Sequence, residues 1–178
     1  MPTKSNTDLI VLALVAEEPI HGYDLVKKAD EGKVADWADL PSSSVYQSLK
    51  NLEAKGYIKA KEVRVGKSPP RAVYRITAGG RSALIGGLLR LMTDPLDPRD
   101  DFSVALLGAE TIPKDRALEA LDIHTSQVMA KFGELEEYFE ENREEMSFAY
   151  RAIYSRLIEQ YRAHIEWLEN FVKQVKDL

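Results

Sequence analysis

Hydrophobic and polar positions change their spacing from one part of the chain to the next. Every residue from 9 to 16 is apolar, so a helix that begins after Asn6 or Thr7, both of which suit a helix cap, has no polar face over two turns. Such a helix must be buried on more than one side. This indicates a second domain or a second subunit beside it.

Two further helices are predicted before the first strand. One covers 21–32 after Pro19, and the next begins at Pro41 or Ser42, because proline suits a first turn and serine suits a cap. The third helix has one apolar stripe, made of Val45, Leu49 and Leu52. Its opposite face is small and polar, as expected of a helix that lies in the DNA major groove.

A β-hairpin is predicted after this helix, with strands over 57–65 and 71–77 and the loop 66–70 between them. The inward positions of the second strand are Ala72, Tyr74 and Ile76. The first strand changes its alternation near Glu62, which predicts a bulge or a change of face there. Thr77 is expected to cap the helix that follows.

Beyond a Pro- and Asp-rich connector at 93–101, the spacing becomes that of long paired helices. A short helix over 101–110 is followed by a long one that starts at Pro113, with a seam at Leu118, Leu121, Thr125, Val128, Phe132, Leu135 and Phe139. The last helix lies beyond Asn142 and has a seam at Tyr154, Ile158, Tyr161, Ile165, Leu168, Val172 and Val175. The two helices should pack as an antiparallel pair.

The last helix is apolar over more surface than one partner helix covers, since a second edge runs along Met146, Tyr150, Ile153 and Leu157. We expect a second subunit to cover it, with burial against the N-terminal part of the same chain as the alternative. The candidate dimerisation residues are Leu9, Leu12, Tyr154, Ile158, Tyr161, Ile165, Leu168 and Val172.

These elements predict a mainly α fold with a small β-hairpin. Residues 1–92 are expected to form a winged helix-turn-helix, and residues 93–178 an α-helical, antiparallel, coiled-coil-like dimerisation domain that could also bind an effector.

Charge is divided unevenly along the chain, although the net charge is only −5. Residues 41–90 hold ten basic and two acidic residues, whereas 91–178 hold ten basic and nineteen acidic residues. Two regions with different partners are therefore expected, and double-stranded DNA suits the first. No apolar run is long enough to cross a membrane and no signal peptide is visible, so we expect a cytoplasmic protein.

The sequence gives little support for an enzymatic activity or for a metal site. Because the chain has no cysteine, disulfides and zinc–thiolate sites are excluded, and no nucleotide-binding or hydrolase motif is present. His21, His124 and His164 have no metal-ligand spacing and do not cluster in the sequence. We therefore expect no enzyme, no cofactor and no metal.

The candidate DNA contacts come from the third helix, the segment before it and the hairpin loop. They are His21, Tyr23, Ser42, Ser43, Ser44, Tyr46, Gln47, Lys50, Arg64, Lys67 and Arg71. Ser43, Ser44 and Gln47 are the expected base readers, and the basic loop suits phosphates or the minor groove.

Three strings, HGYDL at 21–25, SSSVYQSLKNLEAKGYI at 42–58 and PPRAVYRITAGGRSAL at 69–84, resemble the PadR family of bacterial transcriptional regulators over about residues 8–90. The resemblance implies that Tyr23 and Tyr46 support or contact the DNA backbone, though either could be a packed aromatic. Where many members have Tyr-Pro, this chain has Tyr46-Gln47, which leaves the operator sequence open.

The hypothesis from the sequence is a homodimeric, ligand-responsive repressor that binds an inverted repeat, since two recognition helices specify a site better than one. The alternative is a winged-helix protein-interaction adaptor. A small aromatic effector is a candidate partner, because the chain has aromatic residues that could line a pocket: Trp37, Phe102, Phe148, Tyr150, Tyr154, Tyr161 and Trp167.

Overall fold

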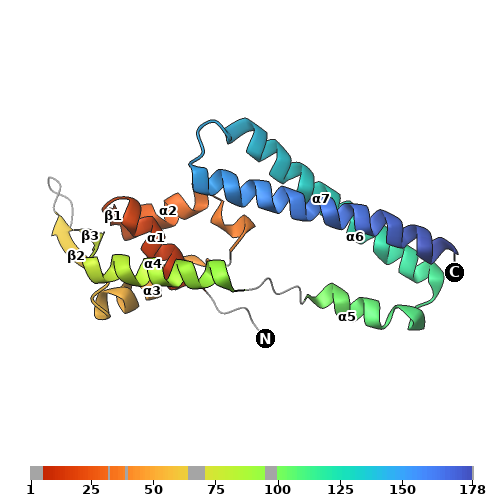
Figure 1. The fold of residues 1–178 in the computed structure, drawn as a ribbon, viewed down its shortest axis with the longest axis horizontal. Helices are drawn as coiled ribbons and strands as arrows, with labels where there is room; N and C mark the ends of the chain where they lie inside the picture. The colour runs from red at the N-terminus through yellow and green to blue at the C-terminus, as the bar shows by residue number, and fades with distance from the viewer. Residues whose placement is uncertain (1–5, 32, 39, 64–70, 95–99, 178) are drawn as a thin grey trace. The chain divides into compact units, whose positions relative to one another are not determined.

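The computed structural model describes residues 6–31, 33–38, 40–63, 71–94 and 100–177. The chain divides into two compact units, unit 1 over Met1–Leu96 and unit 2 over Asp97–Leu178 (Figure 1). Among the described residues, no helix has both the length and the apolar character needed to cross a membrane.

Unit 1 consists of helices around a small sheet. Its elements are α1 (Thr7–Glu17), β1 (Ile20–His21), α2 (Gly22–Glu31), the short 3-10 helix η1 (Val34–Asp36), α3 (Ser42–Ala54), β2 (Ile58–Val63), β3 (Arg71–Ile76) and α4 (Ala78–Thr93). The predicted starts of α1 and α3 are confirmed. The side chain of Thr77 caps α4 by accepting a hydrogen bond from the amide of Gly80, 3.0 Å away, as the sequence indicates.

The core of unit 1 is built on α1. This helix packs against α3, α4 and β3, and its residues Val11 and Val15 are at most 1% exposed. The predicted burial of α1 on more than one side is confirmed. Helices α3 and α4 of its own unit both cover it.

The sheet has three antiparallel strands in the order β1-β3-β2. The sequence predicts only β2 and β3, because the two residues of β1 are too few to show an alternating pattern. The predicted bulge near Glu62 is wrong: the register runs without interruption from Ile58 opposite Ile76 to Val63 opposite Arg71. The alternation fails for another reason: Ile58 is buried, the next four residues are exposed and Val63 is half-buried, so most of β2 lies outside the core.

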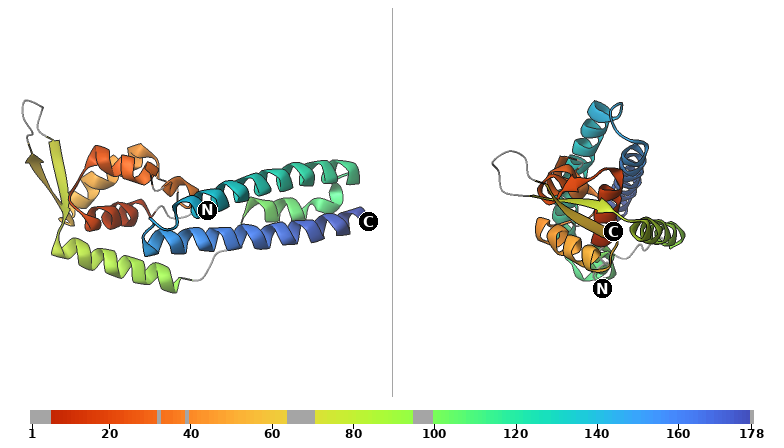
Figure 2. Two further views of the ribbon diagram at one scale, coloured as in Figure 1. Left: turned by 90° about the horizontal axis from the view of Figure 1, so that it is seen from above. Right: turned by 90° about the vertical axis from the view of Figure 1, so that its left-hand side faces the viewer.

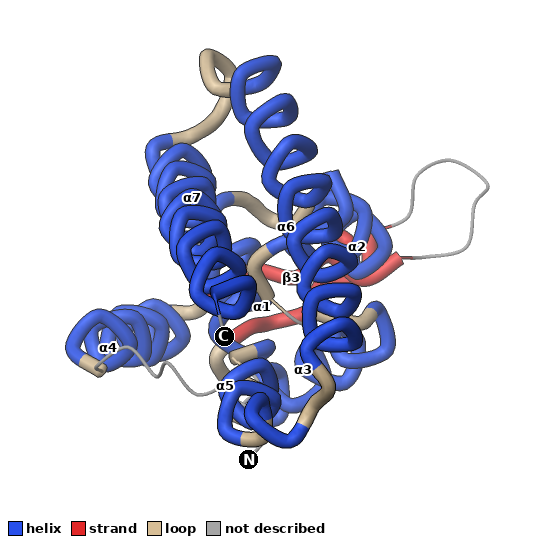
Figure 3. The backbone as a smooth tube through the Cα atoms, turned by 90° about the vertical axis from the view of Figure 1, so that its right-hand side faces the viewer, coloured by secondary structure: helices blue, strands red, loops and turns tan. Residues whose placement is uncertain are grey.

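Unit 2 contains α5 (Asp101–Leu107), the 3-10 helix η2 (Ala109–Thr111), α6 (Lys114–Asn142) and α7 (Phe148–Asp177). The long helices α6 and α7 lie side by side and antiparallel (Figures 2 and 3). The predicted seams face each other in two apolar clusters, one around Leu121 and Leu168 and the other around Leu135 and Tyr154. The mainly α class with a small sheet is therefore confirmed.

Candidate nucleic-acid interface

Helix α3 presents a polar face to solvent because its apolar stripe is fixed in the core. Val45, Leu49 and Leu52 are each 1% exposed. On the other side, Gln47 and Lys50 are exposed, and the Nε2 of Gln47 donates a hydrogen bond to Oδ1 of Asn51 at 3.0 Å. The predicted stripe is confirmed. The first turn adds three serines of which Ser42 and Ser43 are exposed and Ser44 is half-buried.

A polar link fixes α3 against α1. The hydroxyl of Ser48, which is 3% exposed, donates a hydrogen bond to Oδ1 of Asp8 at 2.6 Å. The Nζ of Lys55 lies 3.0 Å from the other oxygen of the same carboxylate. Buried polar groups need such partners, so this contact both satisfies Ser48 and sets the position of α3. Lys55 is thereby paired within the unit.

A hollow of about 610 Å³ lies beside the start of α2. It is lined by His21, Gly22, Tyr23, Tyr46, Ala72 and Tyr74. Tyr23 is 68% exposed and Tyr46 is 46% exposed, so the hydroxyls of both can reach a partner outside the chain. The structure thus brings three of the predicted DNA contacts, from β1, α2 and α3, to one concave surface.

The groups around this hollow are positioned by their own contacts. The Nδ1 of His21 lies 3.1 Å from the carbonyl oxygen of Ala72 and donates to it in the matching tautomer. Gly22 leaves room for the Tyr46 ring, because a Cβ on Gly22 would lie 3.2 Å from Cε1 of Tyr46. Burial raises the pKa of the Tyr74 hydroxyl, and the nearby Glu53 carboxylate raises it further. This hydroxyl therefore stays protonated and can donate a hydrogen bond.

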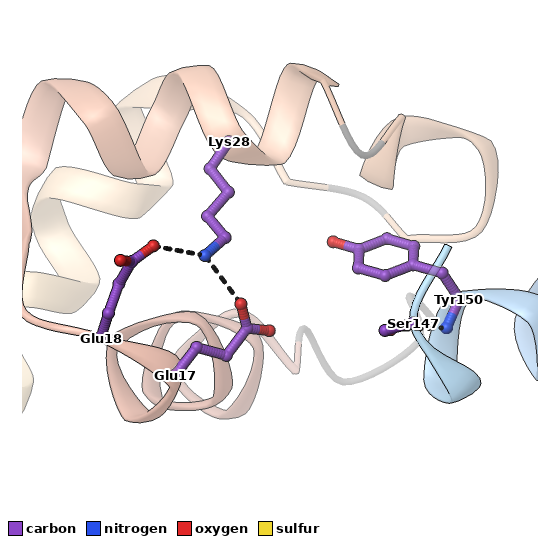
Figure 4. Close-up of polar contacts among 5 residues, drawn as sticks. All are labelled: Glu17, Glu18, Lys28, Ser147 and Tyr150. Atoms are coloured by element: carbon purple, nitrogen blue, oxygen red, sulfur yellow. Dashed lines mark hydrogen bonds and ion pairs between the residues drawn. The ribbon is translucent and has the colours of Figure 1, made fainter. Parts of the chain in front are cut away.

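Helix α2 is tied to the end of α1 by Lys28 (Figure 4). Its Nζ lies 2.7 Å from the carboxylate of Glu17 and 3.0 Å from that of Glu18. The hydrogen bond to Glu17 raises the pKa of Lys28, burial opposes this rise, and Glu18 adds to it. The link holds α2, and with it Tyr23, in place beside α3.

Three other predicted DNA contacts are described only in part or not at all. Arg64 and Lys67 lie outside the described residues, and for Arg71 only the backbone is described, in β3. Among the strand residues whose side chains are described, the exposed Lys and Arg residues are Lys59, Lys61 and Arg75. The assignment of all these residues to DNA stays a prediction.

The predicted dimerisation residues divide into two groups. Four of them are already buried within their own unit: Leu12, Tyr154, Ile158 and Leu168. The other four are half-buried: Leu9, Tyr161, Ile165 and Val172. A partner could therefore contact only the second group without a rearrangement of the core.

Two of the three histidines lie together in unit 2, although the sequence shows no such cluster. The Nε2 atoms of His124 on α6 and His164 on α7 are 3.2 Å apart, and the Phe102 ring stacks on His124 with centroids 4.5 Å apart. The sequence shows no motif that links these two histidines, because 40 positions separate them and only the antiparallel pairing of α6 and α7 brings them together. No group of three metal-ligating side chains occurs among the described residues.

The histidine pair predicts a pH dependence of stability. Burial lowers the pKa of His164, and the neighbouring His124 lowers it further, whereas Asp100 opposes the shift. The unfolded chain therefore binds a proton at His164 before the folded chain does, so the stability should fall as the pH drops below the ordinary histidine value of about 6.5.

We expect the thermal midpoint of unit 2 to decrease between pH 7.5 and 5.5, and His164→Gln to reduce this decrease. Circular dichroism melts at several pH values measure both slopes. Because only the difference between the slopes is interpreted, a general loss of packing in the variant does not affect the test. Parallel pH profiles for the two proteins would contradict the assignment.

Several residues that shape the site are not among those predicted from the sequence. Asn51, although visible on the outer face of α3, is not among the predicted contacts, and it binds Gln47. Asp8 and Ser48 are 40 positions apart, and a lone serine beside an apolar stripe gives no signal of its partner. For Asn51 a signal existed, because it lies four residues beyond Gln47 on the same helical face.

Helices α2 and α3, the three-stranded sheet and the exposed polar face of α3 together define a winged-helix DNA-binding protein. Residues 11–85 match the model of the Transcriptional regulator PadR-like family, so this segment is similar to that family. The chain is thus a transcriptional regulator rather than an enzyme. No protein with a curated description matches it.

Solved structures support the same fold along nearly the whole chain. PadR of Bacillus subtilis in complex with operator DNA is 21% identical, with a TM-score of 0.81, and the match covers 94% of this chain and 98% of that one. The same protein in complex with p-coumaric acid is 20% identical, with a TM-score of 0.81 over 95% and 98% of the two chains. The virulence activator AphA of Vibrio cholerae is 19% identical, with a TM-score of 0.75 over 97% and 99%.

Proposed function

We propose that this chain is a homodimeric repressor that reads an inverted-repeat operator with α3 and responds to a small effector. The exposed polar face of α3 is the observation that supports DNA reading most directly, because Gln47 and Lys50 are free of the core while Leu49 holds the helix in it. Such a protein would work in the cytoplasm, where a bacterial chromosome lies.

Different residues would have different roles on DNA. Gln47 can bond an adenine edge in two places, and Lys50 can donate to guanine or to phosphate. Tyr23 and Tyr46 would donate their hydroxyls to the backbone beside α3. Lys67 and Arg71 would contact phosphates and so add affinity without sequence preference.

Homodimerisation is proposed because one α3 reads too few bases to specify a site. Two copies related by a two-fold axis, with their helices about 34 Å apart, would read an inverted repeat. The half-buried group of Leu9, Tyr161, Ile165 and Val172 offers apolar surface for this contact. Exposed apolar side chains on α4 offer more, since Leu89 is 58% and Met92 80% exposed.

The effector and the direction of regulation rest on the relatives. The Bacillus subtilis PadR structure with p-coumaric acid makes a small aromatic compound a reasonable candidate. Repression is proposed from the family resemblance. The description of AphA as an activator shows that this fold also occurs in a protein that activates.

The deciding experiment is a fluorescence-anisotropy titration of the protein against the DNA upstream of its own gene, beside a scrambled duplex, at two salt concentrations. We expect tighter and salt-sensitive binding to the native DNA, because phosphate contacts release counterions. Binding to neither duplex, or binding that is insensitive to salt, would favour the adaptor alternative. Sedimentation at the same protein concentrations tests the dimer.

Two sets of substitutions separate base reading from phosphate binding. Gln47→Ala should reduce the preference for the operator over the scrambled duplex by about 5-fold to 150-fold for each half-site, which corresponds to roughly 1–3 kcal/mol per protomer. Lys67→Ala with Arg71→Ala should weaken binding to both duplexes and, because a dimer loses four phosphate contacts, lower the salt slope by about four.

The matched controls are Gln160→Ala and Lys173→Ala, two exposed positions on α7, which should leave both affinities unchanged. If Gln47→Ala weakened both duplexes to the same extent, its role as a base reader would be wrong.

A further inference from the structure

We propose that unit 2 holds a binding site for a small, uncharged aromatic molecule, and that this site is distinct from the candidate nucleic-acid interface of unit 1. A half-open cavity of about 740 Å³ lies between α5 and η2, the first turns of α6 and the last turns of α7. This volume lies within the range of about 300–1,000 Å³ that is usual for small-molecule sites. All the residues that line it belong to unit 2, so the site is complete within this unit.

The aromatic residues that line the cavity favour a ligand with a planar ring. Trp167 stacks on Phe171 with centroids 4.9 Å apart and planes 15° apart. Phe102 from α5 meets Trp167 edge to face, with centroids 6.0 Å apart and planes 87° apart. A flat ligand could therefore contact ring faces from α7 and from α5, which are the geometries that aromatic pairs prefer. Trp167 is 41% exposed and can still gain contacts.

The polar groups of the cavity favour a ligand without net charge. Lys114 and Glu110, of opposite sign, both line it, and Gln174 adds a neutral amide. The Nζ of Lys114 donates a hydrogen bond to the carbonyl oxygen of Lys176 at 2.6 Å, which engages the ammonium at the end of α7. A charged ligand would lose water without finding an unopposed partner, whereas an amide or hydroxyl group could bond to Gln174.

Helix α5 forms a wall of this cavity but is packed against the rest of unit 2 only in part. None of the residues of α5 or η2 is fully buried, and Leu107 is 88% exposed. The aromatic contacts of this segment come from Phe102, on the rings of His124, His164 and Trp167. A ligand in the cavity would bury further apolar surface of α5 and so hold this helix more firmly on α6 and α7.

The test uses N-phenyl-1-naphthylamine, a neutral fluorescent aromatic probe, with the full-length protein. The wild type is expected to bind it with a micromolar Kd. Ala120→Trp, which fills the cavity from α6, should weaken binding at least about tenfold, or about 1.4 kcal/mol. Ala130→Trp, an exposed position farther along α6 and not part of the lining, should change it less than twofold. Ala105→Trp fills the cavity from α5 and guards against a folding defect in the first variant.

Two additional measurements test the chemical class of the ligand and the location of its binding site. In displacement of the probe, 1-naphthamide should compete at least about tenfold better than the charged 1-naphthoate. Hydrogen exchange should slow in α5 when the probe is bound. Stronger competition by the carboxylate would overturn the proposed ligand class. Unchanged probe binding in both filled variants would overturn the site.

A second copy of the chain is the competing occupant of the cavity. If the wild type did not bind the probe and Ala120→Trp turned a dimer into a monomer in sedimentation, the cavity would be part of a subunit interface and the proposal would be wrong. None of these readouts uses DNA, so the result does not depend on the function proposed for α3.

Discussion

Gly80→Ala is expected to lower the free energy of unfolding of unit 1 by about 3 kcal/mol. A Cβ on Gly80 would lie 2.0 Å from the carbonyl oxygen of Tyr57 and 2.9 Å from Cγ1 of Ile76. The Tyr57 oxygen cannot simply move away, because it accepts hydrogen bonds from the amide of Thr77 at 2.9 Å and from its hydroxyl at 3.1 Å. The clash is therefore with fixed backbone at the point where β2, β3 and α4 meet.

Gly86→Ala is the matched control on the same helix. Its Cβ would meet nothing within 4 Å, so the lower backbone entropy of alanine in the unfolded chain should raise the stability by about 0.5–1 kcal/mol. Urea unfolding of both variants measures the two changes, which should have opposite signs. A small effect of equal sign in both would mean that α4 can shift away from β2 without cost.

The fold could be predicted from the sequence where the apolar residues of a single helix repeat at regular spacing. The stripe of α3 and the seams of α6 and α7 repeat every three or four residues, and the structure confirms them. Helix α1 is different, because its run of apolar residues shows that it is buried but does not show by what. That α3 and α4 of its own unit cover it follows only from the assembled core.

The candidate site was predictable only in part, for a similar reason. The outer face of α3 follows from the position of its buried stripe, and residues such as Gln47 could be named from it. Contacts between distant segments could not be foreseen: the hydrogen bond of Ser48 to Asp8 and the close approach of Gly22 to Tyr46 join residues 40 and 24 positions apart. Neither contact leaves a periodic signal in the sequence.

Tyr154→Ala should destabilise unit 2 by about 3–5 kcal/mol, the usual cost of removing a large buried aromatic side chain. The Tyr154 side chain is fully buried, at 0% exposure, and its ring lies 5.1 Å from that of Tyr138 between α6 and α7. Phe148→Ala on the same helix removes a side chain of similar size that is 81% exposed, and should change the stability by less than about 0.5 kcal/mol.

The same variant tests whether the proposed dimer depends on the contacts that unit 2 provides. If unit 1 folds on its own and unit 2 provides the dimer contact, heating Tyr154→Ala should melt α6 and α7 first, with the α-helical signal falling in two steps. Between these steps the protein should sediment as a monomer and bind operator DNA little better than scrambled DNA, because one α3 without its two-fold partner reads only half of the site. A single transition would mean that the two units unfold together, and it would contradict the expected order of melting. Specific binding that persists after α6 and α7 have melted would mean that the dimer contact lies in unit 1.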